Sequence, residues 1–593
     1  MSTHEARLQA LRAQLKRDRL DGFVVPICDE HMSEYVGAYA QRLAWLTGFQ
    51  GSAGSAVVLP EEAAIFVDGR YTLQVREQVD ARNWAYVSVP ETSVADWLGA
   101  HASAGARIGY DPWLHTRAWV DQARRALAEA GADLVAVDTN PVDAIWPDRP
   151  GPSKARLEVQ PIEYAGKSSG EKRQGIADFL GKSRADAVIL SALDSIAWTF
   201  NIRSRDVDRT PVALAYAVVN KDATADLFVA PEKMDDAVAQ HLGNAVRVHD
   251  RDAFRDALRG MAGKRVVADP ERAVSAIFGA LEGAGATVLA LRDPAVLAKA
   301  MKNEAEVAGH KAAQARDGAA LSRFLHWLSI EAPKGGQTEL SVAARLEQFR
   351  RDTGLLEDLS FDTISGAGPN GAICHYKVDE ASNREIPLNS LFLIDSGGQY
   401  RDGTTDVTRT VAVGEPTAEM RDRFTRVLKG HIALATAIFP HGTGGGQLDA
   451  LARQYLWAAG LDYAHGTGHG VGAYLAVHEG PQRIASFGGG GEPLRAGMIC
   501  SNEPGYYKAG EYGIRIENLV LVVDKAVPGA EQPMLGFETL TFAPIDRRLI
   551  DLALMSAAER AWVDDYHARV MTIVGPQLDG EARSWLTASC APL

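Results

Sequence analysis

Two pairs of acidic residues follow apolar runs, and this placement restricts how the chain can fold. In LFLIDSGGQYRDGTTDVTRT (391–410), Asp395 ends an apolar strand, turn residues follow, and a Thr/Val-rich strand carries Asp406. A hairpin here places the two carboxylates on neighbouring strands. They repel each other and raise one pKa unless a cation lies between them. The alternative, two surface turn acids, is disfavoured by the apolar run before Asp395.

A second acidic pair has the same arrangement. In MICSNEPGYYKAGEYGIRIENLVLVV (498–523), Glu503 follows an apolar run and precedes Pro-Gly. Glu517 is expected within a strand over 514–523. An isolated buried charge costs on the order of tens of kcal/mol, so a metal ion is the simplest compensation. The alternative is a surface pair of Glu517 with Arg515, which the apolar neighbours of Glu517 disfavour.

Three histidines lie between these segments. YAHGTGHGVGAYLAVHEGP (463–481) holds His465, His469 and His478, separated by glycines. A dinucleotide loop needs G-x-G-x-x-G, and Val471 breaks that pattern. Four carboxylates with one histidine suit two cations such as Mn²⁺, Co²⁺, Zn²⁺ or Mg²⁺. Two such cations can acidify a water molecule, which then serves as the nucleophile without serine or cysteine.

The cysteines offer little competing chemistry. Cys374 precedes His375, but adjacent residues in a strand point to opposite faces, which disfavours a thiol nucleophile. The four cysteines are far apart and form no C-x-x-C motif, so they indicate neither a zinc cluster nor a disulfide framework. Reduced, buried thiols fit a reducing compartment.

Length and charge exclude several classes of protein. A chain of 593 residues predicts three or four domains. Its 76 acids against 62 bases, a net charge of −14, disfavour nonspecific binding to nucleic acid. The charged N-terminus lacks the apolar core of a signal peptide, and no apolar stretch approaches the roughly 18 residues of a membrane span. We therefore expect a cytoplasmic protein with no nucleic-acid or membrane partner.

The rest of the chain alternates strands and helices. A first α/β segment ends near residue 150, at the Pro-rich linker 146–154, and a second ends near residue 300. They share an element order, and whether they are related units stays open. The expected strands are 22–27, 55–59, 63–68, 187–190, 213–219 and 225–229; the expected helices are 5–20, 171–180, 194–200, 303–330 and 557–570.

The order Asp395, Asp406, His469, Glu503, Glu517 resembles the five-ligand pattern of the pita-bread metallopeptidases, which include methionine aminopeptidase, prolidase and aminopeptidase P. HGTGHGVGAYLAVHEG resembles the proline-peptidase signature, and DSGGQY, TTDVTRT, NEPGYY and GIRIEN extend the match. WLTGFQGSAGSAVV, FVDGRYTLQV and DSIAWTFNIR, in two α/β segments ahead of it, resemble the long, three-domain cytosolic form of aminopeptidase P.

The resemblance implies an α/β and α+β multidomain fold. Two creatinase-like α/β domains (1–150 and 151–302) would precede a pita-bread catalytic domain (303–545) and a helical C-terminal extension (546–593). It implies a homodimeric metalloaminopeptidase that releases the N-terminal residue from peptides with proline second. Manganese is the usual metal, with Zn²⁺ or Co²⁺ possible.

The resemblance also implies roles for the metal ligands. Asp395 would bind one metal and His469 the other, while Asp406 and Glu517 would bridge both. Glu503 would complete the second metal's shell and take a proton from the attacking water.

It further implies that His375, His465 and His478 line the substrate site. They would orient the scissile carbonyl, stabilise the oxyanion and protonate the leaving proline nitrogen, and the division of these tasks stays open. Arg515 would support the metals or the substrate. Alternatives are a prolidase restricted to Xaa-Pro dipeptides, a noncatalytic pita-bread peptide-binding protein, and a creatinase-like amidinohydrolase.

Overall fold

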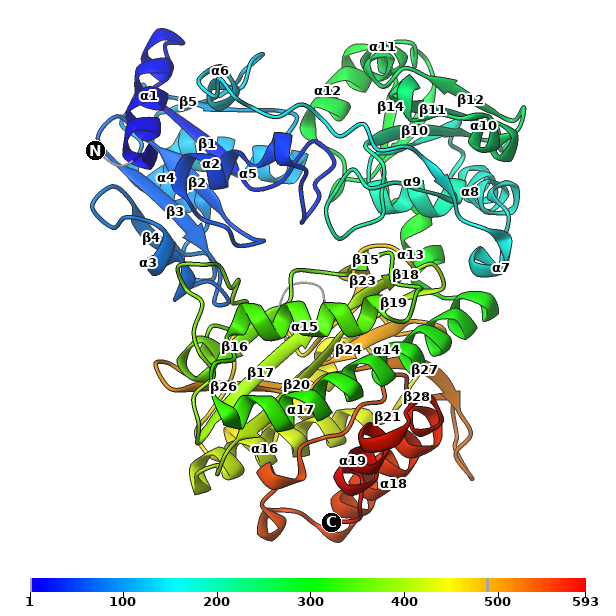
Figure 1. Ribbon diagram of the computed structural model, residues 1–593. Coiled ribbons are helices and arrows are strands. Elements are labelled where there is room, and N and C mark those ends of the chain that lie inside the picture. Colours follow the sequence, from blue (N-terminus) through cyan, green and yellow to red (C-terminus); the bar gives the residue numbers. More distant parts are fainter. Residues whose placement is uncertain (1–2, 487–489) are drawn as a thin grey trace. The chain divides into compact units, whose positions relative to one another are not determined.

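The computed structural model describes residues 3–486 and 490–593 and divides into two compact units (Figure 1). Unit 1 comprises Met1–Ile162 and Lys167–Val296, and unit 2 comprises Glu163–Gly166 and Leu297–Leu593. No helix among the described residues combines the length and the apolar character needed to cross a membrane.

Unit 1 begins with a six-stranded sheet in the order β4-β3-β2-β1-β5-β6. Helix α1 presents Leu8, Leu11 and Leu15 to its core, as the leucine spacing predicted. The strands are β1 (Gly22–Pro26), β2 (Ser55–Val58), β3 (Ala63–Val67), β4 (Ala85–Ser88), β5 (Arg107–Tyr110) and β6 (Asp133–Ala136). The helices are α1 (Thr3–Arg17), α2 (Arg42–Thr47), α3 (Gln74–Gln78), α4 (Val94–His101), α5 (Arg117–Glu129) and α6 (Pro141–Ala144).

A second six-stranded sheet of unit 1 has the order β12-β11-β10-β8-β13-β14. Its strands are β8 (Ala187–Leu190), β10 (Ala215–Asn220), β11 (Ala225–Val229), β12 (Val246–His249), β13 (Arg265–Ala268) and β14 (Thr287–Ala290). The helices of this part are α8 (Ser169–Ser183), α9 (Leu193–Phe200), α10 (Asp236–Leu242), α11 (Phe254–Arg259) and α12 (Ser275–Gly283).

The two sheets of unit 1 have the same topology. In each, the first strand pairs antiparallel with the second and parallel with the fifth, while the third and fourth pair in parallel. The shared element order noted in the sequence therefore reflects one strand arrangement built twice.

Unit 2 places long helices against a short antiparallel sheet in the order β16-β17-β20. Residues of α14 and α15 share one core with β17 and β20, and Figure 1 shows both helices along these strands. The elements are α14 (Glu304–Glu331), α15 (Glu339–Arg351), β16 (Ile364–Ala367), β17 (Ser390–Ser396) and β20 (Val407–Val413). Asn303 caps α14 by accepting from the backbone N–H of Ala305 and Glu306, so the helix begins where the sequence predicted.

A larger sheet of unit 2 has the order β21-β28-β27-β24-β22-β23 and packs against α16 and α17. Its strands are β21 (Ile438–Pro440), β22 (Gly468–Gly470), β23 (Glu479–Ile484), β24 (Ile499–Asn502), β27 (Asn518–Lys525) and β28 (Met534–Thr539). The helices are α16 (Ala418–Ala435) and α17 (Gly445–Trp457), with α18 (Ala557–Ile573) and α19 (Gly580–Ser589) at the C-terminus. Smaller sheets contain β15 (Asp358–Leu359), β18 (Gly398–Tyr400) and β19 (Gly403–Thr404), and β25 (Gly505–Lys508) and β26 (Tyr512–Arg515).

Two local predictions were wrong. The expected strand 514–523 is interrupted, because Arg515 pairs with β25 whereas Asn518 pairs with β24, and the chain changes sheets at Ile516 and Glu517. The residues Cys374 and His375 lie in a turn after a short 3₁₀ segment and not in a strand, so the argument from opposite strand faces does not apply to them.

Two glycine-to-alanine substitutions should change stability in opposite directions, because only Gly430 lies at the contact between α16 and α17. A Cβ on Gly430 of α16 would lie 2.0 Å from the Ala452 carbonyl oxygen of α17, whereas one on Gly175 of α8 meets nothing within 4 Å. Gly430→Ala should lower the free energy of unfolding by about 1–3 kcal/mol through overpacking. Gly175→Ala, the matched control, should raise it by about 0.5–1 kcal/mol. Denaturant unfolding measures both, and a neutral Gly430→Ala would contradict the packing.

Candidate metal centre

The strand pairing brings the four predicted carboxylates to one region of unit 2. In the antiparallel pair β17–β20, Asp395 lies opposite Thr408, and Asp406 directly precedes β20. In the pair β24–β27, Asn502 lies opposite Asn518, so Glu503 and Glu517 follow and precede the matched ends. The two acids of each pair therefore lie near the end of two antiparallel strands, as predicted from the sequence.

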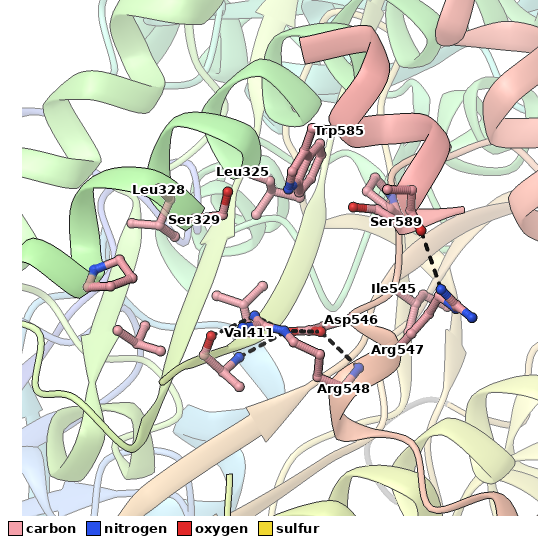
Figure 2. Close-up of a pocket in the computed structure, with 15 residues that line it drawn as sticks. Leu325, Leu328, Ser329, Val411, Ile545, Asp546, Arg547, Arg548, Trp585 and Ser589 are labelled. Atoms are coloured by element: carbon pink, nitrogen blue, oxygen red, sulfur yellow. Dashed lines mark hydrogen bonds and ion pairs between the residues drawn. The ribbon is translucent and has the colours of Figure 1, made fainter. Parts of the chain in front are cut away.

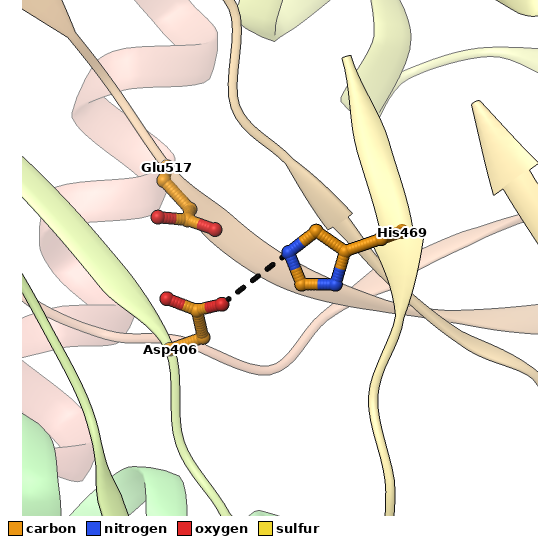
Figure 3. A group of neighbouring side chains, drawn as sticks. All are labelled: Asp406, His469 and Glu517. Atoms are coloured by element: carbon orange, nitrogen blue, oxygen red, sulfur yellow. Dashed lines mark ion pairs between the residues drawn. The ribbon is translucent and has the colours of Figure 1, made fainter. Parts of the chain in front are cut away.

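His469 joins this cluster from β22. Ligand atoms of Asp406, His469 and Glu517 all lie within 4.8 Å of one another (Figure 3). His469 Nε2 lies 3.4 Å from both Asp406 Oδ2 and Glu503 Oε1. Its Nδ1 is 3.0 Å from the Gly470 carbonyl oxygen and must donate to it, which leaves the Nε2 lone pair facing the carboxylates. This is the tautomer that a metal ligand requires.

Asp395 supplies an oxygen that lacks a protein partner. Arg515 Nη2 donates to Asp395 Oδ2 at 2.6 Å, while Oδ1 is buried with no hydrogen-bond partner among the described residues. Such an oxygen costs free energy unless a donor or cation satisfies it. Together with the oxygen-rich donor set around His469, this orphaned atom fits a site for two hard or borderline divalent cations.

Burial and mutual repulsion shape the electrostatics of the cluster. Burial raises the pKa of Asp406 and Glu517 well above their usual range, and the neighbouring carboxylates raise both further. Burial also raises the pKa of Glu503, and it lowers that of His469 to about 4. Without cations, Asp406 and Glu517 therefore hold their protons to a higher pH than free carboxyl groups do, and the His469 imidazole is neutral at pH 7.

Arg515 connects the cluster to two of the predicted histidine regions. Besides Asp395, it donates from Nη1 to the Cys374 carbonyl oxygen at 3.2 Å, in the turn that carries His375, and to the Tyr507 hydroxyl oxygen at 2.6 Å. The Tyr507 hydroxyl also lies 2.8 Å from His465 Nε2. Since His465 Nδ1 donates to the Gly466 carbonyl, Nε2 accepts from Tyr507.

The other two histidines are held by different parts of unit 2. The turn carrying His375 follows a loop organised by Glu339, which is buried and accepts from the Ala367 N–H at 2.7 Å and the Tyr376 hydroxyl at 2.9 Å. The His478 ring lies against His469, with centroids 4.4 Å apart in an edge-to-face arrangement.

Three residues that contact the carboxylates or their neighbours Arg515 and His465 were missed in the sequence. Thr408 Oγ1 donates to Glu517 at 2.7 Å, and Ser501 Oγ donates to Glu503 at 3.1 Å. Ser501 lies two residues before Glu503 and Thr408 two residues after Asp406, so the two-residue period of strands could have identified both. Tyr507, the third, had no comparable signal.

A cavity of about 360 Å³ elsewhere in unit 2 contains none of these residues (Figure 2). It lies between α14, α19 and the far end of β20, and residues such as Leu325, Val411 and Trp585 line it. This cavity is therefore distinct from the candidate metal centre, which lies at the other end of β20.

Models of known protein families match most of this chain. Residues 308–524 match the model of metallopeptidase family M24, and residues 533–593 match the C-terminal region of peptidase M24. Residues 7–145 and 148–306 each match a creatinase/prolidase N-terminal domain. A probable Xaa-Pro aminopeptidase P of Aspergillus niger is 41% identical over 610 residues, covering 99% of this chain and 98% of the relative. This chain belongs to the aminopeptidase P group of metallopeptidase family M24.

A plant relative and two solved structures are also similar to this chain. Aminopeptidase P2 of Arabidopsis thaliana is 40% identical, covering 97% of this chain and 86% of the relative. The crystal structure of X-prolyl aminopeptidase from Caenorhabditis elegans, described as a cytosolic enzyme with a dinuclear active site, covers 100% of both chains with a TM-score of 0.95 and 35% identity. A Xaa-Pro dipeptidase from Bacillus anthracis, 22% identical with a TM-score of 0.52, covers 64% of this chain and 99% of its own, and shares the fold. The expected creatinase-like and pita-bread fold is confirmed.

The stability of the metal-free protein should fall as the pH rises, whereas its stabilisation by added metal should increase. The ordinary pKa values of Asp406 and Glu517 are 3.8 and 4.5, and both are raised on folding, so the folded metal-free chain binds more protons than the unfolded chain. Their stabilising contribution is present below about pH 4 and is lost as the pH rises through the raised values. Cations bind deprotonated carboxylates, so stabilisation by added Mn²⁺ should grow as the pH rises.

Thermal unfolding with and without Mn²⁺, between about pH 5 and pH 8, measures both trends. Glu517→Gln is the matched variant, because it removes one of the titrating groups and should flatten the pH dependence of the metal-free protein. An Mn²⁺-induced shift of equal size across this range would contradict the assignment.

Proposed function

We propose that this protein is a metalloaminopeptidase that releases the N-terminal residue from peptides whose second residue is proline. The grouping of Asp406, His469 and Glu517, whose ligand atoms lie within 4.8 Å of one another, carries this proposal. With the neighbouring Glu503 and Asp395 they form a donor set that suits two divalent cations. The similarity along the full chain to Xaa-Pro aminopeptidases P supports the choice of substrate. Mn²⁺ is the first candidate metal, with Zn²⁺ or Co²⁺ as alternatives.

The five candidate ligands would bind the two cations in different ways. Asp395 would bind one cation and His469 the other, while Asp406 and Glu517 would contact both. When bound, two such cations acidify a water molecule and polarise a carbonyl. Glu503 would complete the ligand set and accept the proton of the attacking water.

Three histidines would line the substrate site. The leaving nitrogen of proline belongs to a tertiary amide and must be protonated as it departs. His375 and His478 would orient and stabilise the scissile carbonyl and deliver that proton. Both ring nitrogens of His465 are engaged by the protein, which supports a role in orienting Tyr507 at the edge of the substrate site. Arg515 would hold Asp395 in place and steady the turn carrying His375.

Selectivity for proline would follow from its shape. Proline has a fixed φ and no N–H, so a site for its ring need not satisfy a backbone donor at the second residue. We also propose domain boundaries at 1–150, 151–302, 303–545 and 546–593, a homodimeric assembly and a cytoplasmic location. The ranges matched by the family models support the boundaries, and the cytosolic description of the Caenorhabditis elegans relative supports the location.

Removing a metal ligand should abolish turnover. Asp406→Ala and His469→Ala should each lose nearly all peptidase activity and part of their bound metal, because each removes a donor from the cluster. Asp402→Asn is the matched control, since Asp402 lies in the same turn region and pairs with Arg316 at 2.8 Å. Metal analysis and peptide cleavage measure the effects. Wild-type turnover in either alanine variant would refute the site.

A pair of peptides tests the substrate class. The protein should cleave Arg-Pro-Pro, and chelation should abolish this activity until Mn²⁺ is restored. A prolidase would cleave Gly-Pro and spare the tripeptide, so that pattern would replace the present proposal with the prolidase alternative. Failure to cleave either peptide with a full metal complement would favour a noncatalytic binding role.

A further inference from the structure

A buried charge cluster lies beside His478, among residues that take no part in the chemistry above. Lys299 Nζ donates to Glu479 Oε2 at 2.6 Å, and Lys302 Nζ donates to Glu479 Oε1. The side chains of Lys299, Lys302 and Glu479 are 1%, 0% and 1% exposed, respectively. Lys302 Nζ also donates to the Lys299 carbonyl oxygen at 2.9 Å.

This arrangement fixes both the position and the rotation of the Glu479 carboxylate. Each oxygen has its own ammonium donor, and charge-assisted hydrogen bonds in a water-free interior are strong and directional. A buried ion pair is weak evidence for added stability, because desolvation of the charges offsets their attraction. Its clearest effect is geometric, since the carboxylate cannot turn without breaking one of two buried contacts.

The anchored residue is next to a predicted catalytic histidine. Glu479 is the first residue of β23, and His478 directly precedes it. His478 lies in a bend that leads into this strand. The Glu479 side chain contacts the buried lysines, while the His478 ring lies against His469, 4.4 Å away between centroids.

Glu479 is also connected to His469 through the pairing of β23 with β22. Glu479 pairs with Gly470 of β22, whose carbonyl oxygen accepts from His469 Nδ1. The approach is close, because a Cβ on Gly470 would lie 2.4 Å from the Glu479 carbonyl oxygen. The Glu479 backbone therefore pairs with the residue that follows His469, and it is joined directly to His478.

We propose that Glu479, clamped by Lys299 and Lys302, is a positioning residue that sets His478 against His469 for turnover. This proposal rests on the proposed peptidase function. The clamp acts through His478, so its loss lowers kcat with little change in KM or in metal content.

Three variants test the clamp directly. Lys299→Met and Lys302→Met each leave Glu479 with one lysine and a neutral pair, so both should fold. Each frees one carboxylate oxygen and should lower kcat several-fold. Glu479→Gln should lower kcat roughly 100-fold, the size of effect that a misplacement of about 1 Å can produce. A wild-type kcat in all three would overturn the proposal.

A double-mutant cycle separates positioning from a general structural role. His478→Ala should itself lose mainly turnover. In that background Glu479→Gln should cause no further loss of kcat, because the residue through which it acts is absent. Losses that multiply in the double variant would show that Glu479 does not act through His478, and a fall confined to substrate affinity would overturn the assigned role.

Two further variants serve as controls for effects on folding. Lys299→Met/Lys302→Met/Glu479→Gln removes all three charges, so no buried ion is left unpaired. It should fold, bind metal and still turn over slowly. Lys429→Met/Glu559→Gln removes another partly buried ion pair, with 15% and 12% side-chain exposure, that lies between α16 and α18. This control should keep wild-type kcat whatever its stability, and wild-type kcat in the triple variant would overturn the proposal.

A readout independent of activity distinguishes this proposal from the proposed function. In Zn²⁺-loaded protein with ¹⁵N-labelled histidine, the His478 ring signal is assigned by its absence in His478→Ala. It should be shifted or broadened in Lys299→Met/Lys302→Met. An unchanged signal would overturn the clamp even if the peptidase is active. A changed signal in a protein that cleaves no Xaa-Pro peptide would retain the clamp and refute the proposed function.

Discussion

Repulsion among buried carboxylates is the constraint on which the catalytic unit depends. Burial raises the pKa of Asp406, Glu503 and Glu517, and neighbouring acids contribute to each increase. Among the described residues, Arg515 is the buried cation that donates to a carboxylate of the cluster, and that carboxylate is Asp395. One guanidinium does not balance four carboxylates, which is why a pair of divalent cations completes the charge balance.

The antiparallel pairs of unit 2 make this repulsion tolerable because they resist rearrangement. β17 is paired along its length with β20, and β24 with β27, so the acids at their ends cannot separate without breaking backbone hydrogen bonds. Arg409, also buried, ties these pairs together by donating to the Glu517 carbonyl oxygen at 2.7 Å and to Asn518 Oδ1 at 2.8 Å. The protein therefore stores an unfavourable electrostatic arrangement in a rigid scaffold.

The histidines are held by separate devices. Hydrogen bonding to backbone carbonyls sets the tautomers of His469 and His465, while Glu339 organises the loop before His375. Lys299 and Lys302 fix the position of Glu479 and, through it, the position of His478. Side chains must be held within a fraction of an ångström for such chemistry, and each of these devices uses a group in the layer behind the reacting residue.

The amino-acid sequence by itself indicated the candidate metal-ligating residues and the approximate bounds of several strands and helices. Asp395 and Glu503 follow apolar runs, and the glycine-spaced histidines lie between the two acidic segments. The strands at 187–190 and 225–229 were predicted residue for residue. These features are local, because burial of an apolar run and the chemistry of a turn depend on near neighbours in the chain.

Only the tertiary structure decided which groups support those residues. Lys299 lies 180 positions from Glu479, and Tyr507 lies 42 positions from His465, so no local pattern connects them. The break between β26 and β27 at Glu517 also escaped prediction, because it arises where one segment pairs with two different sheets. Contacts between distant segments depend on how the sheets pack, and a linear pattern of residues does not encode that packing in any short window.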